Sequence, residues 1–183
     1  MSEWQERNGV SAQSIQRWQR PGREWMKVNS DGAFTEERCE GGWSAVIRDA
    51  DGEFILAEVG RLQHALDALQ AEAYACLAGV MMAIDQGIGR VIFETDSLIL
   101  KQALENPTHR LSSSGGLICE LQCLISSSFI SYAINFVPRS CNRVAHALAA
   151  LGCKCPHGDK LQWESTLTDV EDLVASDIAE SLS

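Results

Sequence analysis

The sequence lacks the long apolar run that a membrane-spanning helix needs. None of its 183 residues lies in an uninterrupted apolar window of ~18 residues, the length at which a spanning helix becomes a candidate. The amino-terminal stretch MSEWQERNGVSAQ also lacks the apolar centre of a secretory signal. We therefore expect an intracellular protein, in the nucleus or the cytoplasm, that has no contact with a membrane.

Basic side chains are scarce as well. The chain has 15 Lys and Arg residues against 25 Asp and Glu, which gives a formal net charge of −10. Proteins that bind nucleic acid mainly by electrostatic attraction carry a surplus of Lys and Arg, which displaces counterions from the phosphates. The composition argues against that class, and any binding of nucleic acid should be weak and strongly limited by salt.

The seven cysteines show neither a disulfide frame nor a complete zinc site. Their number is odd and they are scattered through apolar stretches, which is typical of free thiols in a reducing compartment. Only Cys153 and Cys155, followed by His157, lie close together in the sequence. A structural zinc site needs four ligands, and no second pair of ligands is present. We interpret this segment as a solvent-exposed turn after a helix.

The chain divides into one domain and two flanks. Residues 1–24 are polar and end in RPGRE, which indicates a linker. Residues 25–152 carry the patterns of a single α/β domain. Residues 153–183 form an acidic tail, whose apolar positions from Val170 to Leu182 predict an amphipathic helix. That helix either packs back on the domain or stays solvated, and we favour these two interpretations over a dedicated partner helix.

Periodicity predicts three antiparallel strands at the start of the domain. The first covers residues 27–34, and the next two lie in GGWSAVIRDADGEFILAEVG, joined by a hairpin turn at 49–52. A helical stripe then runs from Leu69 to Gly87. The remaining elements are a strand over 90–95, a helix over 97–104, a helix over 116–125, a strand over 130–137, and a helix capped by Ser140 that ends near Gly152. The order βββαβααβα is typical of an α/β domain with a mixed sheet.

Three carboxylates lie in apolar or structured segments: Asp31 in KVNSDGAF, Glu72 in QAEAYACLAG and Asp96 in VIFETDS. A lone acid is costly to keep ionised in such surroundings. Ala68 and Cys76 lie one helical turn on either side of Glu72, so this glutamate should point toward the sheet. Asp31 belongs to the first strand and Asp96 ends the fourth, so the three acids converge if those strands are neighbours.

Converged carboxylates raise one another's pKa unless cations lie between them. Oxygen ligands suit Mg²⁺ or Mn²⁺, and two such ions ~3.5–4 Å apart can activate a water and stabilise a leaving oxygen. The trio therefore predicts a two-metal site and phosphodiester hydrolysis. Each acid alone has another explanation. Asp31 could lie in a turn with Gly32, Glu72 could be a charge on a helix flank, and Asp96 could be an N-cap.

Five segments together resemble a known family. KVNSDGAF, the hairpin GGWSAVIRDADGEFI, QAEAYACLAG, VIFETDS and VPRSCNRVAHALA are similar, in order and spacing, to the type 1 ribonuclease H-like domains of plant genomes. Those domains are usually relics or parts of retroelement reverse transcriptases. The resemblance runs from about residue 18 to residue 152. It implies a ribonuclease H-like fold with a five-stranded mixed sheet, and metal-dependent endonucleolytic cutting of the RNA strand of RNA·DNA hybrids.

The resemblance also implies roles for single residues. Asp31, Glu72 and Asp96 match the first three catalytic and metal-binding acids, and Asp31 would bridge both ions. The fourth acid falls where this chain has His146, in the stretch that begins at Asn142. We expect His146 to line the site as a weak ligand for Mg²⁺, because imidazole prefers Mn²⁺ or Zn²⁺. The alternative is a polar residue on the second turn of its helix.

Two hypotheses about function follow. The first is a nuclease that acts on RNA·DNA hybrids. The second is a catalytically weak or inactive module that binds nucleic acid or a protein partner through the same fold. The second gains support from His146, from the net charge, and from a segment that reads NPTHRLSSSG, with His109 and Arg110, where some family members insert a basic helix. An exonuclease or a polynucleotide transferase fits the order of elements less well.

Overall fold

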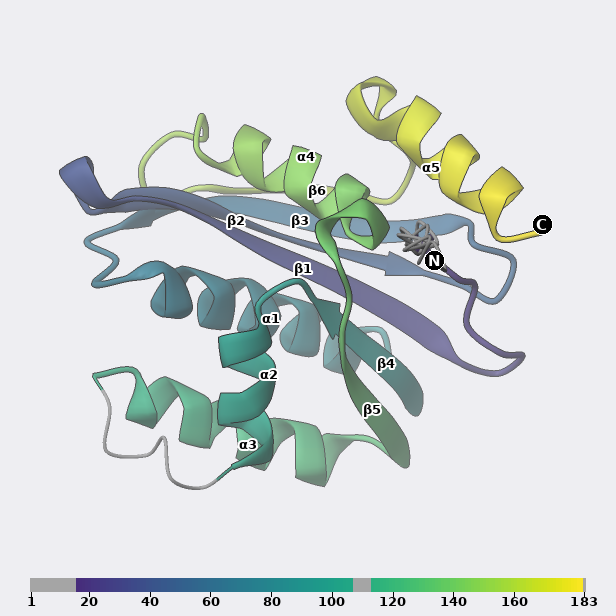
Figure 1. Ribbon diagram of the computed structural model, residues 1–183, viewed down its shortest axis with the longest axis horizontal. Helices are drawn as coiled ribbons and strands as arrows, with labels where there is room; N and C mark the ends of the chain where they lie inside the picture. Colours follow the sequence, from purple (N-terminus) through teal and green to yellow (C-terminus); the bar gives the residue numbers. More distant parts are fainter. Residues whose placement is uncertain (1–15, 107–112, 183) are drawn as a thin grey trace, which may run out of the picture.

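The computed structural model describes residues 16–106 and 113–182, which form a mixed six-stranded sheet with helices on both faces (Figure 1). The strand order is β5-β4-β1-β2-β3-β6. Strand β1 pairs antiparallel with β2 and parallel with β4. The strands are β1 (Met26–Thr35), β2 (Glu40–Arg48), β3 (Phe54–Gln63), β4 (Arg90–Thr95), β5 (Ser131–Phe136) and β6 (Lys160–Trp163).

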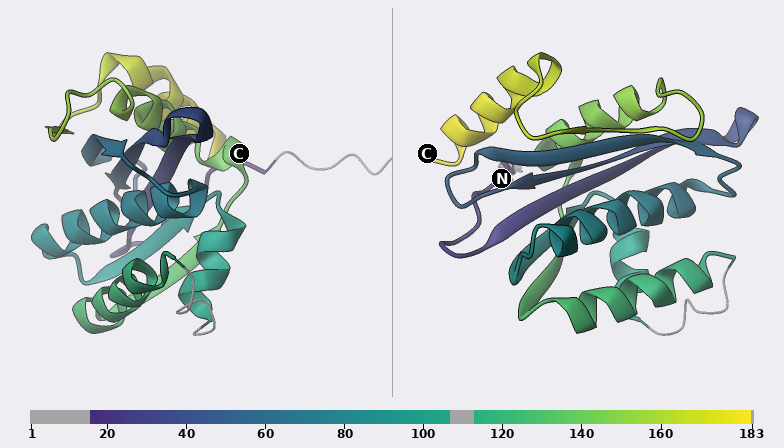
Figure 2. Two further views of the ribbon diagram at one scale, coloured as in Figure 1. Left: turned by 90° about the vertical axis from the view of Figure 1, so that its left-hand side faces the viewer. Right: turned by 180° about the vertical axis from the view of Figure 1, so that it is seen from behind.

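The helices lie in two layers, one on each face of the sheet (Figures 1 and 2). One layer holds α1 (Ala68–Asp85), α2 (Leu98–Glu105) and α3 (Gly115–Ser128), and the other holds α4 (Arg143–Gly152) and α5 (Thr168–Glu180). Two short 3₁₀ turns, η1 (Glu36–Arg38) and η3 (Arg139–Cys141), complete the elements that concern the site. None of the helices in the described ranges is long and apolar enough to cross a membrane.

Each helical layer covers its own apolar core. The core under α1, α2 and α3 includes Val28 of β1 and Phe93 of β4. The core under α4 and α5 includes Val46 of β2 and Leu148 of α4. Because successive side chains of a strand point to opposite faces, β1 sends Val28 toward α1 and Asn29 toward α4. This alternation delivers every second residue of β1 to the face on which α4 lies.

The predicted α/β fold and its element order are confirmed, and local signals explain the boundaries. Asp67 and Ser97 cap α1 and α2, with their side chains accepting from the backbone N–H groups three residues ahead. The predicted hairpin between β2 and β3 turns at Asp49, whose carboxylate accepts two backbone N–H groups. Gly52 completes the turn at a φ of 84°, a conformation that favours glycine.

Three expectations differ from the structure. Ser140 does not cap the helix: it lies in η3, where its hydroxyl donates to the carbonyl of Gln16, and Asn142 occupies the N-cap position. Trp18, placed in a polar linker, is buried. The sheet has six strands because the tail adds β6, which pairs with the otherwise open edge of β3 and is too short for its periodicity to be recognised.

The acidic tail contains the predicted helix, α5, and this helix packs back on the domain. Val170 and Val174 are buried in the core that α5 shares with α4. Cys153, Cys155 and His157 follow α4 in a stretch of turns, as expected, although Cys155 is buried. His109 and Arg110 lie outside the described residues.

Candidate active site

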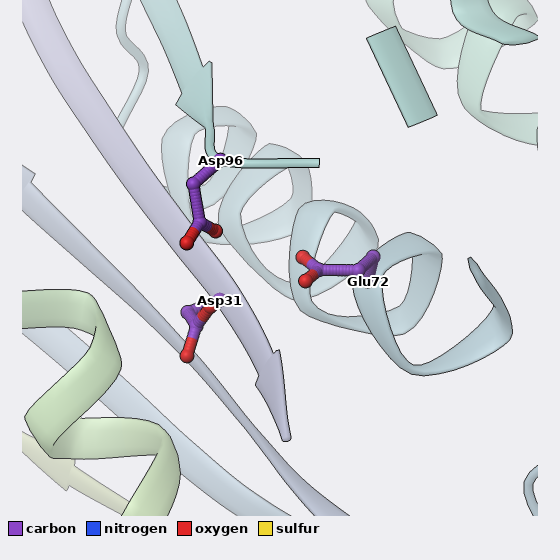
Figure 3. A group of neighbouring side chains, drawn as sticks. All are labelled: Asp31, Glu72 and Asp96. Carbon is purple, nitrogen blue, oxygen red and sulfur yellow. The ribbon is translucent and has the colours of Figure 1, made fainter. Parts of the chain in front are cut away.

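The two aspartates are brought together by the pairing of β1 with β4. These strands run parallel, and Ser30 lies opposite Thr95 as the last pair of their ladder. Asp31 and Asp96 are the next residue on each side, so they meet where β4 ends (Figure 3). Asp31 is only 1% exposed, and the Asp96 side chain is 6% exposed.

Glu72 reaches the same point from α1 because Gly32 lets this helix approach β1 closely. A Cβ atom at position 32 would lie 2.4 Å from the backbone carbonyl carbon of Ala71, so any larger residue would push α1 away. At this distance the Glu72 carboxylate accepts a hydrogen bond from the Gly32 backbone N–H at 3.3 Å. The side chain of Glu72 is buried and points at Asp31 and Asp96 (Figure 3).

The three carboxylates offer oxygen atoms that all lie within 4.8 Å of one another. Across residues 16–106 and 113–182 no other group of three or more His, Cys, Asp or Glu side chains is so arranged, and the Cys153 segment forms none. The alternative explanations fail: Asp31 lies within a strand, Glu72 is buried, and Ser97 caps α2. The predicted convergence is therefore present in the fold, while the role of the acids as metal ligands stays a prediction.

Burial and mutual repulsion make it costly to ionise all three acids in the metal-free protein. Burial, followed by repulsion from Asp31 and Asp96, raises the pKa of Glu72 to about 9. Burial and the charge of Asp96 raise the pKa of Asp31 to about 6. The Oδ1 atom of Asp31 is buried and has no hydrogen-bond partner within residues 16–106 and 113–182. A cluster of oxygen atoms that includes an unpartnered carboxylate oxygen suits a hard divalent cation such as Mg²⁺ or Mn²⁺.

Two cationic or polar side chains border the acids. Nδ1 of His146 and Oδ2 of Asp31 form a hydrogen bond at 3.0 Å, which opposes the rise in the pKa of that aspartate. The His146 side chain is half-exposed and comes from α4. Arg139, on η3, donates from Nε to Oδ2 of Asp96 at 3.0 Å and is 63% exposed. Sequence reasoning placed His146 near the site but did not single out Arg139.

Asn142 is a second residue that sequence reasoning missed. Its amide Nδ2 donates to the carbonyl of Ser30 at 2.9 Å and to Oδ1 of Asp96 at 3.3 Å. Its Oδ1 accepts from Nδ2 of Asn29 at 3.1 Å. Asn142 therefore joins α4 to both strands that carry the aspartates. The only signal in the sequence was its place four residues before His146 in the motif that begins α4.

Comparison with known families supplies the wider context. Residues 29–152 match the model of a family described as reverse transcriptase-like. The chain belongs to the reverse transcriptase-like family. The matched region contains Asp31, Glu72, Asp96 and His146, whereas Trp18 and all of α5 lie outside it. Comparison with curated proteins finds no match.

Solved structures place this reverse transcriptase-like domain in the ribonuclease H fold. RNase H1 from Halobacterium salinarum is 21% identical, with a TM-score of 0.60 over 71% of this chain and 98% of that one. The N-terminal RNase H domain of a Mycobacterium tuberculosis protein is 23% identical, with a TM-score of 0.64 over 71% and 94%. LC11-RNase H1 in complex with an RNA/DNA hybrid is 14% identical, with a TM-score of 0.59 over 70% and 96%. At these identities the likeness establishes the fold.

The raised pKa of Glu72 predicts how stability depends on pH. Its folded-state pKa of about 9 exceeds the ordinary value of 4.5, so the free energy of unfolding of the metal-free protein falls as pH rises through that interval. Glu72→Gln keeps the shape and removes this penalty. We expect the variant to be more stable than wild type at pH 7, by up to about 3 kcal/mol, and nearly equal to it at pH 5.

Denaturant unfolding in EDTA at both pH values measures this difference. Glu120→Gln, an exposed change of the same kind on α3, is the matched control and should shift stability at neither pH. If Glu72→Gln is more stable than wild type by the same amount at pH 5 and pH 7, ionisation of the Glu72 carboxyl is not the cause of the difference in stability.

Proposed function

We propose that this protein is a metal-dependent endonuclease of the ribonuclease H type that hydrolyses the RNA strand of RNA·DNA hybrids. The observation that carries the proposal is the convergence of Asp31, Glu72 and Asp96 at the end of β4 in a ribonuclease H fold. The hybrid bound to LC11-RNase H1, a protein of the same fold, supports this class of substrate. The motif resemblance supports an origin in a plant retroelement, and we also propose that the protein acts in the nucleus or the cytoplasm.

The acids have distinct places in the proposed site. Asp31 has one oxygen atom in contact with His146, and the other has no hydrogen-bond partner in the part of the chain that the structure describes. Glu72 and Asp96 flank it and complete a set of oxygen ligands for Mg²⁺ or Mn²⁺. A bound pair of such ions supplies the activation of water and the stabilisation of the leaving oxygen. Since Glu72 and Asp31 hold protons more tightly than free carboxyls, metal binding must displace protons and strengthens as pH rises.

Arg139 is the side chain best placed to meet the substrate beside these acids. Its guanidinium is largely exposed and remains held to Asp96 through Nε, which leaves its terminal N–H groups free for a phosphate. One arginine contributes little affinity to a polyanion, and the net charge of −10 opposes binding. We expect weak, salt-limited affinity for the hybrid.

The test is an incubation of the purified protein with labelled RNA·DNA hybrid, double-stranded RNA and single-stranded RNA, each with Mg²⁺, Mn²⁺ or EDTA. We expect cleavage of the RNA strand of the hybrid alone, at internal positions, with Mn²⁺ more effective than Mg²⁺ and no product in EDTA. Cleavage of all three substrates would contradict hybrid specificity, and cleavage in EDTA would contradict metal dependence.

The second candidate is a catalytically weak or silent module that binds nucleic acid or a protein. Two observations favour it: His146 contacts Asp31 where the family pattern has an acid, and the Arg139 cation is bound to Asp96. This candidate predicts no product after prolonged incubation with Mn²⁺, with retention of the hybrid in a binding assay if the module binds nucleic acid and no retention if its partner is a protein. The same incubation therefore separates the two functions.

A further inference from the structure

Segments on either side of the family-matched region meet over β1. Trp18, before that region, is 1% exposed, and its ring covers the guanidinium of Arg48 at 3.5 Å. Its indole N–H donates to Oδ1 of Asn29 at 3.1 Å. Two residues later, Arg20 donates to the hydroxyl of Ser181 at 2.9 Å, just past the end of α5. The amino-terminal flank and the carboxy-terminal helix are thereby joined to each other and to the sheet.

Asp177 of α5 is the anchor of this junction. It is 1% exposed, and its two carboxylate oxygens bind Arg48 at 2.8 Å and Arg143 at 2.7 Å. Arg48 on β2 is equally buried, and a buried charge is strongly destabilising unless an opposite charge satisfies it. Arg143 is the first residue of α4, directly after Asn142. Asp177 therefore holds β2 and the start of α4 in one arrangement.

From this anchor a chain of hydrogen bonds runs to the acid cluster. Arg48 donates to Oδ1 of Asn29 at 3.4 Å, and Nδ2 of Asn29 donates to Oδ1 of Asn142 at 3.1 Å. Nδ2 of Asn142 then donates to Oδ1 of Asp96 at 3.3 Å. Both asparagines are buried, so water does not compete for these bonds and each amide has one orientation that satisfies its partners.

We infer that the two flanks outside the family-matched region form part of the active site, with Asp177 and Trp18 as positioning residues that hold Asp96 through Asn29 and Asn142. Altering a residue that orients a metal ligand without touching the metal typically changes metal affinity or activity by roughly 10–100-fold. We expect effects in this range for Asp177 and Trp18. This inference rests on the metal-dependent function proposed above. It assigns a role in positioning Asp96 to residues 16–25 and to α5, which lie outside the region that matches the family model.

Two full-length variants test this positioning role. Asp177→Asn keeps the size of the side chain but removes the charge that binds both arginines, and Trp18→Phe keeps the ring over Arg48 but removes the N–H that fixes Asn29. We expect the dissociation constant for Mn²⁺, measured by calorimetry, to rise about tenfold in Asp177→Asn and less in Trp18→Phe. In hybrid cleavage, kcat should fall and KM should stay unchanged, because neither residue lies at the exposed surface of the site.

Val174→Ala is the matched control, because it weakens the packing of α5 but leaves the hydrogen-bond chain intact. It should lower the melting temperature without changing Mn²⁺ affinity. If Asp177→Asn does not fold, Trp18→Phe decides alone: weaker Mn²⁺ binding supports the role and wild-type binding overturns it. Folded variants that bind Mn²⁺ like wild type also overturn it. Wild type that binds Mn²⁺ without cutting hybrid refutes the nuclease alone, whereas wild type that binds no Mn²⁺ refutes both proposals.

Discussion

Asp31→Asn is expected to lower hybrid cleavage by at least about a hundredfold, because it removes a proposed metal ligand, and the loss of an outer-shell partner alone typically costs 10–100-fold. Asp31 is the most buried member of the acid cluster, and its Oδ1 atom has no hydrogen-bond partner among the described residues. An amide nitrogen in place of either carboxylate oxygen of Asp31 cannot coordinate a cation. The expected result is measured as the initial rate of product formation from labelled hybrid in saturating Mn²⁺.

The same variant separates loss of catalysis from loss of structure. Burial and Asp96 raise the pKa of Asp31 to about 6, so at neutral pH, where this carboxyl is mostly ionised, its charge destabilises the metal-free folded state. Replacing it by a neutral amide should leave the melting temperature in EDTA equal or higher, and Mn²⁺ should no longer raise it. Asp51→Asn, on the exposed hairpin turn, is the matched control and should retain full activity. Unchanged cleavage by Asp31→Asn would assign the activity to another site or to a contaminant.

The acid cluster was predictable because each member carries a local signal. Asp31 lies on the polar side of an alternating strand, Glu72 lies on the buried side of a helix, and Asp96 follows a short apolar strand. The order of elements then makes β1 and β4 neighbours, and their register places the two aspartates side by side. Gly32 completes the convergence, since only a residue without a side chain allows α1 to cross so close to β1.

The supporting network was not predictable from periodicity, because its members are polar residues that tertiary contacts bury. Trp18 stands among polar residues, and Arg48 is the last residue of β2, beside a hairpin turn. Asp177 follows Val174 by three residues, so it lies on the apolar side of α5, and a charge there was the one available hint. Each of these residues is stabilised by a partner far away in the sequence, which no local pattern reports.

His146→Asp is expected to strengthen Mg²⁺ binding by about tenfold or more, the scale on which even outer-shell changes affect metal affinity. The Nδ1 atom of His146 lies 3.0 Å from Asp31, so a carboxylate at this position would face the most buried acid of the cluster. If residue 146 is a ligand, the substitution replaces a softer, neutral group by a hard, charged one, which favours Mg²⁺ over the ions that imidazole prefers. Hybrid cleavage in Mg²⁺ should rise, and the ratio of the Mn²⁺ rate to the Mg²⁺ rate should fall.

The charge that His146→Asp introduces should also change the melting temperature, which can be measured without an activity assay. An additional anion beside Asp31 increases repulsion in the metal-free protein, so the melting temperature of His146→Asp in EDTA should fall. Added Mg²⁺ should then raise it by more than it does in wild type, because a ligand that binds more tightly stabilises the folded state more, by an amount that grows with the logarithm of its affinity. His146→Asn, which introduces no charge, should show neither change. If His146→Asp leaves both the metal preference and the Mg²⁺-induced shift as they are in wild type, then residue 146 lies outside the metal site and its contact with Asp31 is structural.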